Sequence, residues 1–407
     1  MILCPARASD LDEVCAFLAT ATRPPEHVHA LFTADPAFDP AQIRVARTGG
    51  RIIACAKMYR RMLRLGTTVV PACGIGNVRT DPQRRHRGLA GALLGECLTA
   101  MYLQGVLLAP LLAPRRELFV RHGWHSIPEI RLEIPAEALA ATAVADKPGD
   151  VRVRLCEDAD LDAVMMLYDA VNAARTGTLV RERDDWLRCL AVLDLQGATI
   201  YVATRGDEIV GYMAVQPWNK SIDVLEMLLA PQLIAPVAPD QSSAATDVVR
   251  SLLHAALAQH RDAVVVRAGL PADYRRLVCD ALAPHVATAG CADLMLRLVD
   301  PLHLLQQLAP GLSARLRAGY DVAPLSVRIG PLPGGAVLRA RHDGVVVERS
   351  HRDDEPVLPD AVFLALLLGT EDAWAQLDNL PLPKAMGQTL QHLFPHQDWV
   401  FWRSDAF

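Results

Sequence analysis

The chain has 407 residues, 51% of them hydrophobic and 21% charged, so it is long enough for two or three domains with cores of their own. A formal net charge of −5 disfavours nucleic acid as a partner, because nucleic-acid-binding surfaces are usually basic. The start of the sequence lacks a basic region leading into an apolar stretch, and the longest apolar segment, residues 106–113, is interrupted by Pro110. We therefore expect a soluble, cytoplasmic protein that does not bind a membrane.

Nine cysteines are scattered along the chain without a CxxC pair. Most lie in apolar runs, as Cys15 and Cys97 do, which is typical of small core residues in a reducing compartment. We expect neither disulfides nor a bound metal.

Helical and extended patterns alternate through residues 1–135, which favours an α+β or α/β layer. A helix is predicted from Asp10, where apolar residues recur at helical spacing, and Gly49-Gly50 suits a hairpin turn. A second, strong helix is predicted to bury one face, formed by Leu89, Leu93, Cys97 and Met101. The predicted strands cover residues 43–46, 51–58, 74–80 and 105–110.

The first domain boundary is predicted at residues 136–150, which end in Lys-Pro-Gly-Asp. The order strand, helix, hairpin then recurs, with strands at 151–155, 200–203 and 209–215, and residues 230–243 are predicted to form a loop. From about residue 300 a separate α+β pattern begins. Its predicted helices cover 302–308, 361–368 and 384–393, and its predicted strands cover 326–329, 336–340 and 344–349.

A chemical signal comes from residues 78–91, where a strand ends, a loop carries several cations, and a helix begins at small residues. The free N–H groups and the dipole of a helix N-terminus attract a pyrophosphate. Gly88, Ala90 and Gly91 let phosphates approach the backbone, and Arg85 and Arg87 would add charge-assisted hydrogen bonds. Taken alone, the pattern also fits a solvated basic loop before an amphipathic helix. The candidate cofactor-binding residues are Val78, Arg79, Thr80, Arg85, His86, Arg87, Gly88, Leu89, Ala90 and Gly91.

Residues 85–90, Arg-His-Arg-Gly-Leu-Ala, resemble the Arg/Gln-x-x-Gly-x-Gly/Ala signature of GNAT acetyltransferases. The resemblance implies acetyl-CoA at this loop, with residues 78–80 as the splayed strand whose backbone holds the pantetheine. Residues 118–124 resemble the element that follows in that family. Over the whole chain the sequence resembles the enhanced intracellular survival (Eis) acetyltransferases, on residues 292–301 and on the C-terminal residues 393–395 and 405–407.

The Eis resemblance implies an α+β fold of two tandem GNAT-like domains, the second degenerate, followed by a sterol-carrier-like domain. The expected domains are an acetyl-CoA-binding domain at 1–140, a second GNAT-like domain without a CoA loop at 150–298, and the sterol-carrier-like domain at 299–407. The family also implies a homo-oligomer, namely a hexamer.

The implied reaction is the direct attack of a primary amine on acetyl-CoA in a ternary complex. The carboxylate of the last residue, Phe407, would be the base. An α-carboxyl pKa of ~3.5 lies about 7 units below that of an amine, so the carboxylate needs burial or a bridging water. Phe119 stands where the family has its proton-donating tyrosine, and a phenyl ring donates nothing. The candidates to replace it are His122 and His125, which lie close in sequence, and Tyr59, which lies in an earlier strand, but none of them matches a donor of the family. A histidine could serve as the donor near neutral pH.

The acceptor implied by the resemblance is an aminoglycoside-like cation, a polyamine or a lysine side chain. Glu26, Asp35 and Asp39 lie in the region that usually covers the acceptor, but capping and turn roles suit them equally well. Two other functions stay open. Phe119 allows a non-catalytic acyl-CoA-binding or regulatory protein, and the sterol-carrier-like domain allows a lipid-binding protein.

Overall fold

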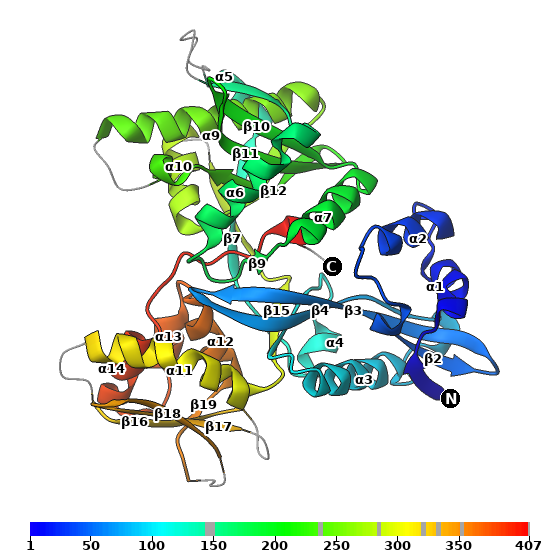
Figure 1. The fold of residues 1–407 in the computed structure, drawn as a ribbon, viewed down its shortest axis with the longest axis vertical. Helices are drawn as coiled ribbons and strands as arrows, with labels where there is room; N and C mark the ends of the chain where they lie inside the picture. The colour runs from blue at the N-terminus through cyan, green and yellow to red at the C-terminus, as the bar shows by residue number, and fades with distance from the viewer. Residues whose placement is uncertain are drawn as a thin grey trace.

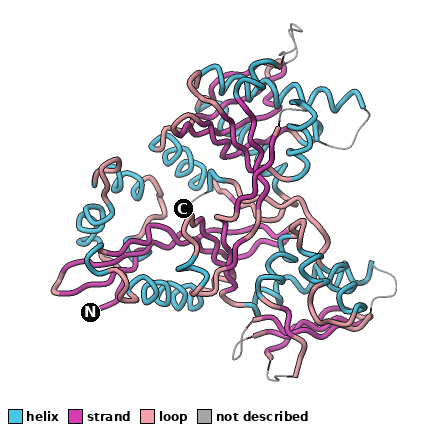
Figure 2. The backbone as a smooth tube through the Cα atoms, turned by 180° about the vertical axis from the view of Figure 1, so that it is seen from behind, coloured by secondary structure: helices cyan, strands magenta, loops and turns pink. Residues whose placement is uncertain are grey.

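The computed structural model describes residues 1–142, 151–234, 239–282, 286–318, 323–330, 335–350 and 354–405, with only the backbone of 239–243. The chain forms three lobes, each built around one sheet with helices packed on it (Figure 1). Seen from behind, the lobes meet around a central region of strands (Figure 2). The expected α+β class with several sheets is confirmed.

The first lobe contains eight described strands in the order β1-β2-β3-β4-β5-β15-β6, with β9 beside β3. They are β1 (Ile2–Pro5), β2 (Ile43–Thr48), β3 (Arg51–Leu65), β4 (Thr68–Thr80), β5 (Leu108–Leu112), β6 (His125–Ser126), β9 (Leu179–Val180) and β15 (Leu294–Leu298). The predicted hairpin is confirmed, since Gly49 and Gly50 both have positive φ between β2 and β3. β3 and β4 are longer than predicted and form a ribbon that extends beyond the rest of the sheet (Figure 1).

Helices cover both faces of the first sheet. One face is covered by α3 (Leu89–Leu103), and the predicted stripe is confirmed because its four residues are all buried. The other face is covered by α1 (Leu11–Leu18) and α2 (Pro25–Thr33), which share a buried cluster with Ile43 and Val45 of β2 and with Ile52 and Cys55 of β3. The short α4 (Glu117–Val120) precedes β6.

The second lobe has seven described strands in the order β14-β7-β13-β12-β11-β10-β8. They are β7 (Glu129–Pro135), β8 (Arg152–Leu155), β10 (Thr199–Arg205), β11 (Glu208–Trp218), β12 (Ser221–Leu229), β13 (Val265–Gly269) and β14 (Ala287–Cys291). Its helices are α5 (Ala136–Ala141), α6 (Leu161–Asn172), α7 (Arg183–Leu195), α8 (Pro231–Ile234), α9 (Pro239–Gln259) and α10 (Ala272–Leu282). The loop predicted at 230–243 is therefore wrong where the structure describes it, because α8 and the first turn of α9 occupy that stretch.

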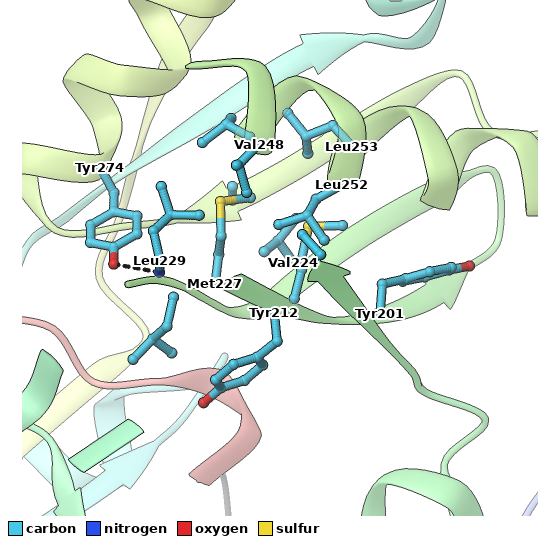
Figure 3. Packing of buried hydrophobic residues seen from close by; sticks show 14 of the residues in the cluster. Tyr201, Tyr212, Val224, Met227, Leu229, Val248, Leu252, Leu253 and Tyr274 are labelled. Carbon is cyan, nitrogen blue, oxygen red and sulfur yellow. Dashed lines mark hydrogen bonds between the residues drawn. The ribbon is translucent and has the colours of Figure 1, made fainter. Parts of the chain in front are cut away.

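Figure 3 shows how the second sheet separates its two faces. Val248 and Leu252 of α9 pack on the strands from one side, where the Tyr274 hydroxyl accepts a hydrogen bond from the Leu229 N–H at 2.9 Å. Tyr212 points to the opposite side, and its hydroxyl donates to Glu226. One face is thus an apolar core, whereas the other carries buried polar groups.

The first two lobes exchange strands. β7 follows the first lobe in sequence but pairs with β13 and β14 in the second sheet. β15 follows the second lobe but lies between β5 and β6 in the first sheet. The division at residues 140, 150 and 298 stays a prediction, and each of the first two segments contributes a strand to the sheet of the other.

The third lobe has a sheet in the order β18-β17-β16-β19 and packs on the end of the β3–β4 ribbon. Its strands are β16 (Leu325–Ile329), β17 (Ala336–Arg341), β18 (Gly344–Arg349) and β19 (Val357–Leu358). Its helices are α11 (Pro301–Ala318), α12 (Asp360–Leu368), α13 (Ala373–Asp378) and α14 (Lys384–Leu393). The predicted elements of this region are confirmed. Among the described helices of the whole chain, none is long and apolar enough to cross a membrane.

The aromatic C-terminal segment joins the lobes. Phe401 packs in the third lobe, whereas Trp402 packs in the second, where its indole N–H donates to Asn172 at 3.3 Å. Gly177 has a φ of +92°, and a Cβ there would lie 2.6 Å from the carbonyl oxygen of Val400, so the backbones touch where only glycine fits. The segment is docked, and its aromatic side chains pack into two cores rather than one.

Candidate active site

The main feature of the first sheet is a gap in strand pairing. β4 pairs with β3 along its length except at Asn77 and Val78, but with β5 it pairs at Ala72 and Leu108 alone. Beyond that pair β4 and β5 have no further ladder pairs, and the ladder between β3 and β4 is irregular between Cys55 and Lys57 of β3, at Asn77 of β4, whose φ is +51°. The edge of β4 beyond Ala72 therefore presents backbone groups without ladder partners on β5. Such an edge can bind an extended chain that carries amide groups.

The open edge of β4 leads into the N-terminus of α3. Gly88 is the N-cap residue with φ +75°, a left-handed conformation that disfavours every side chain. The first hydrogen bond of the helix runs from the Ala92 N–H to the Gly88 carbonyl at 3.0 Å. The preceding N–H groups of the first turn have no acceptor within the helix and can bind an anion.

The side chains around this turn suit a pyrophosphate. Arg85 and Arg87 are exposed in the loop, so both can reach a bound phosphate. A Cβ at Gly91 would lie 2.7 Å from Nε2 of His122, so the imidazole sits against the first turn of α3. The described residues of loop and helix thus fit an acyl-CoA, with its pyrophosphate at Gly88 and its extended arm along β4.

The side chains of two predicted cofactor residues, Arg79 and Val78, are engaged in contacts within the protein. The Arg79 guanidinium donates to the carbonyls of Leu18 and Ala19 at 2.7 and 2.9 Å, which ties the end of β4 to α1. Val78 packs against the core under α3. A ligand along β4 would meet the backbone of these residues.

On the opposite face, beneath α2, lies a buried lysine. The Nζ of Lys57 lies 4.4, 4.6 and 4.4 Å from the ring centroids of Phe32, Phe38 and Tyr59. Burial lowers the pKa of Lys57 to about 7, although the nearby charge of Asp35 opposes this shift. Three ring faces partly compensate the ammonium for lost water.

Tyr59 connects this face to the irregular part of β4. Its hydroxyl accepts a hydrogen bond from the Asn77 side-chain amide at 2.7 Å. Burial raises the pKa of Tyr59, so the hydroxyl keeps its proton at neutral pH. A protonated phenol beside this part of β4 can donate a proton to a group bound there.

The other candidate donors lie elsewhere. Phe119 packs edge-on against Trp124, with ring centroids 6.0 Å apart, as part of the core under α3. His122 faces the first turn of α3. His125 is half-buried on β6 towards the third lobe, where burial lowers its pKa and Asp360 opposes this effect. Of the three candidate replacements for Phe119, Tyr59 is the one that hydrogen-bonds a residue in the irregular part of β4.

Two of the three acidic residues near α2, Asp35 and Asp39, have structural roles. Asp35 accepts the Ala37 N–H at 3.0 Å and pairs with Arg61 at 3.3 Å. Asp39 accepts the Ala41 N–H at 2.8 Å, and Glu26 is exposed in the first turn of α2. The turn roles that the sequence allows are therefore confirmed for Asp35 and Asp39.

A buried ion-pair cluster fixes the end of the described chain to the second lobe. Arg181 donates to Glu226 and, at 2.9 Å, to Asp405, and all three side chains are almost completely buried. The guanidinium also lies 4.2 Å from the ring centroid of Tyr168. This cluster anchors Asp405 beside α7, close to the first lobe. Phe407, the predicted base, lies outside the described residues.

Glu129, Cys291 and Asp293 bring possible metal-ligand atoms within 4.8 Å of one another. Arg403 donates to both carboxylates of this group, and the contacts with Arg403 help to lower the pKa of Asp293 to about 2 against the effect of burial. These ion pairs account for the cluster.

Comparison with known proteins assigns the first lobe. Residues 4–127 match the family model described as an acetyltransferase (GNAT) domain. The expectation of an acyltransferase is thereby confirmed, and an acyl-CoA is the co-substrate used by this fold. No curated protein matches the chain significantly.

Solved structures resemble the whole chain. A GCN5-related N-acetyltransferase from Kribbella flavida is 17% identical with a TM-score of 0.67, and the match covers 100% of this chain and 98% of that one. A GCN5-related N-acetyltransferase from Anabaena variabilis is 14% identical with a TM-score of 0.70, covering 100% of both chains. Eis1 from Mycobacterium abscessus is 20% identical with a TM-score of 0.65, also covering 100% of both. At these identities the likeness concerns the fold.

Proposed function

We propose that the protein transfers an acetyl group from acetyl-CoA to a primary amine. The observation that carries this proposal is the continuous path from the open edge of β4 to the free N–H groups of α3. In the proposed complex the pyrophosphate binds at Gly88 and the pantetheine runs along residues 78–80. The thioester then lies near Asn77, in the irregular part of β4.

In the reaction, the amine nitrogen forms a bond to the thioester carbonyl carbon and the carbon–sulfur bond breaks. The amine loses a proton to a base, and the leaving thiolate gains one from an acid. We propose Tyr59 as the acid, because its hydroxyl is protonated and contacts Asn77. The carboxylate of Phe407 is our proposed base, on the family resemblance alone. Its basicity would come from burial or from a bridging water.

The proposed acceptor is a small primary amine or a lysine side chain that enters from the side of α2. Aminoglycoside-like cations and polyamines are the alternatives implied by the family resemblance. On the same resemblance, we also propose that the third lobe is a sterol-carrier-like domain and that the protein forms a homo-oligomer.

The test is thiol release from acetyl-CoA with a panel of amines, alongside calorimetry of acetyl-CoA binding. We expect thiol release with at least one amine, and we expect calorimetry to show one acetyl-CoA binding site per chain. Phe119 favours a second candidate, a non-catalytic acyl-CoA-binding protein. Tight acetyl-CoA binding without turnover on any amine would replace the first proposal by this one.

A further inference from the structure

At the boundary between the first and second lobes, α7 contacts α2 (Figure 1), and three cations lie on the elements near this contact. Lys57 and Arg61 lie on β3, and Arg188 lies on α7. Asp35 pairs with Arg61. Burial is the main cause that lowers the pKa of Arg188; the charge of Arg61 lowers it further, whereas the charges of Asp405 and Asp35 oppose the shift.

Arg188 has no partner among the residues that the structure describes. Its side chain is 7% exposed, and its guanidinium forms neither a hydrogen bond nor an ion pair with them; the Nε atom is fully buried. Arg181, seven positions earlier, shows the usual arrangement, since it is buried against Glu226 and Asp405. The charges of Asp405 and Asp35 act on Arg188, but neither carboxylate bonds it directly. A buried guanidinium without a directly bonded anion is costly, so the arrangement around Arg188 indicates a missing anionic group.

The position of this missing group is informative. Arg188 acts electrostatically on both Lys57 and Tyr59. Tyr59 in turn hydrogen-bonds Asn77, where the proposed thioester lies. The planar guanidinium fork matches a carboxylate through two parallel hydrogen bonds.

We infer that Arg188, with Arg61 beside it, binds a carboxylate at the lobe boundary, next to the proposed acyl site. The inference rests on the proposed function and deepens it, because the second lobe then contributes a group to a reaction held by the first. The bound carboxylate can come from either of two sources. One is an acidic group of the amine acceptor, which would favour amino acids over polycations. The other is the carboxylate proposed as base at Phe407.

The experiment compares wild type with Arg188→Gln, Arg188→Lys and the control Arg183→Gln. Arg183 lies on the same helix but is exposed, where it pairs with Asp162. Each protein is assayed with two matched amine pairs, lysine against cadaverine and ornithine against putrescine, whose members differ by one carboxylate. Arg188→Gln should lower kcat/KM by roughly 30-fold or more, as expected when one partner of a buried charge pair is truncated. Arg188→Lys should recover part of this loss, and acetyl-CoA affinity should stay unchanged.

The pattern of the loss separates the two carboxylates. A loss confined to lysine and ornithine, mainly in KM, assigns the acceptor. An equal loss in kcat for all four amines assigns the C-terminal carboxylate. In that case a one-residue extension after Phe407 should cause the same loss, and the double variant should be no worse than either single one. Turnover equal to that of Arg183→Gln on all amines would overturn the inference, as would a loss explained by lower acetyl-CoA affinity or unfolding.

If wild type acetylates no amine, the proposed function fails separately from the carboxylate site. The site is then tested by thermal unfolding of wild type and Arg188→Gln, with and without glutarate, and of the protein extended after Phe407. The site would be supported if glutarate, or the free C-terminus, raises the melting temperature of wild type and this increase is absent in Arg188→Gln. Equal melting temperatures throughout would overturn it.

Discussion

Gly88 offers a direct test of the phosphate site, through Gly88→Glu. Its φ of +75° makes any side chain there unfavourable by about 1–2 kcal/mol. The added carboxylate would stand beside the free N–H groups of α3. At a separation of roughly 5 Å and an effective dielectric constant of about 20, each phosphate charge would be repelled by about 3 kcal/mol. Acetyl-CoA affinity should therefore fall by more than about 100-fold.

The matched control is Gly95→Glu in the same helix. Gly95 is exposed, and a Cβ there meets nothing within 4 Å, so the same change in charge should leave binding within a few-fold of wild type. Both variants are titrated with acetyl-CoA by calorimetry, and far-ultraviolet circular dichroism checks that α3 is retained. Comparable affinities for Gly88→Glu and Gly95→Glu would show that the pyrophosphate does not bind at this turn.

The remaining predictions concern the opposite face of the sheet. Lys57→Met removes a group whose pKa is about 7 in the folded chain and 10.5 in its unperturbed state. Between these two pH values the unfolded wild type binds more protons than the folded one, so the stability of wild type should increase as the pH rises from 7 to 10.5. Denaturant unfolding should show the variant more stable than wild type at pH 6, by up to roughly 5 kcal/mol, with the advantage disappearing near pH 10; parallel pH curves would contradict the burial argument. Tyr59→Phe should lower turnover by ~10²–10⁴-fold at unchanged acetyl-CoA affinity, and normal turnover would remove Tyr59 from the reaction. Phe119→Tyr should leave the rate nearly unchanged, because Phe119 packs in the core under α3; a large gain in thiol release would instead restore the family's donor position. His122→Ala and His125→Ala should each retain turnover, and a kcat loss in either would name that histidine as the donor.

Local features of the site were predictable from the sequence, whereas its long-range partners were not. The strand, arginine-rich loop and helix around Gly88 are contiguous, so their order alone predicts free N–H groups at the turn. Tyr59 was one of three candidates, and only the β3–β4 register brings its hydroxyl to Asn77. Arg188 gave no signal, because a single arginine on an amphipathic helix is usually solvated. Lys57, within the apolar run of β3, is a local hint of the cation group.

The strand exchange was also beyond sequence reasoning. β15 is a short apolar run at the end of the second segment, and nothing local distinguishes a strand that pairs nearby from one that pairs with β5. The loop predicted at 230–243 was wrong for a related reason. Its proline, alanine and serine content is typical of a loop, but α8 and α9 pack on the second sheet, and tertiary contacts override such weak preferences.

The exchanged strands have a consequence for how the chain is made. While the ribosome synthesises the first segment, β5 lacks its neighbour until residue 298 has emerged, and β6 has no strand to pair with. The first sheet therefore cannot be completed before nearly three quarters of the chain have been synthesised. Until then the apolar edge of β5 remains exposed to solvent. Contacts so distant in sequence slow folding and favour aggregation of unfinished chains. The proposed acyl-CoA site belongs to this sheet, so the sheet around it would be completed late, although the residues of the site are among the first to be made.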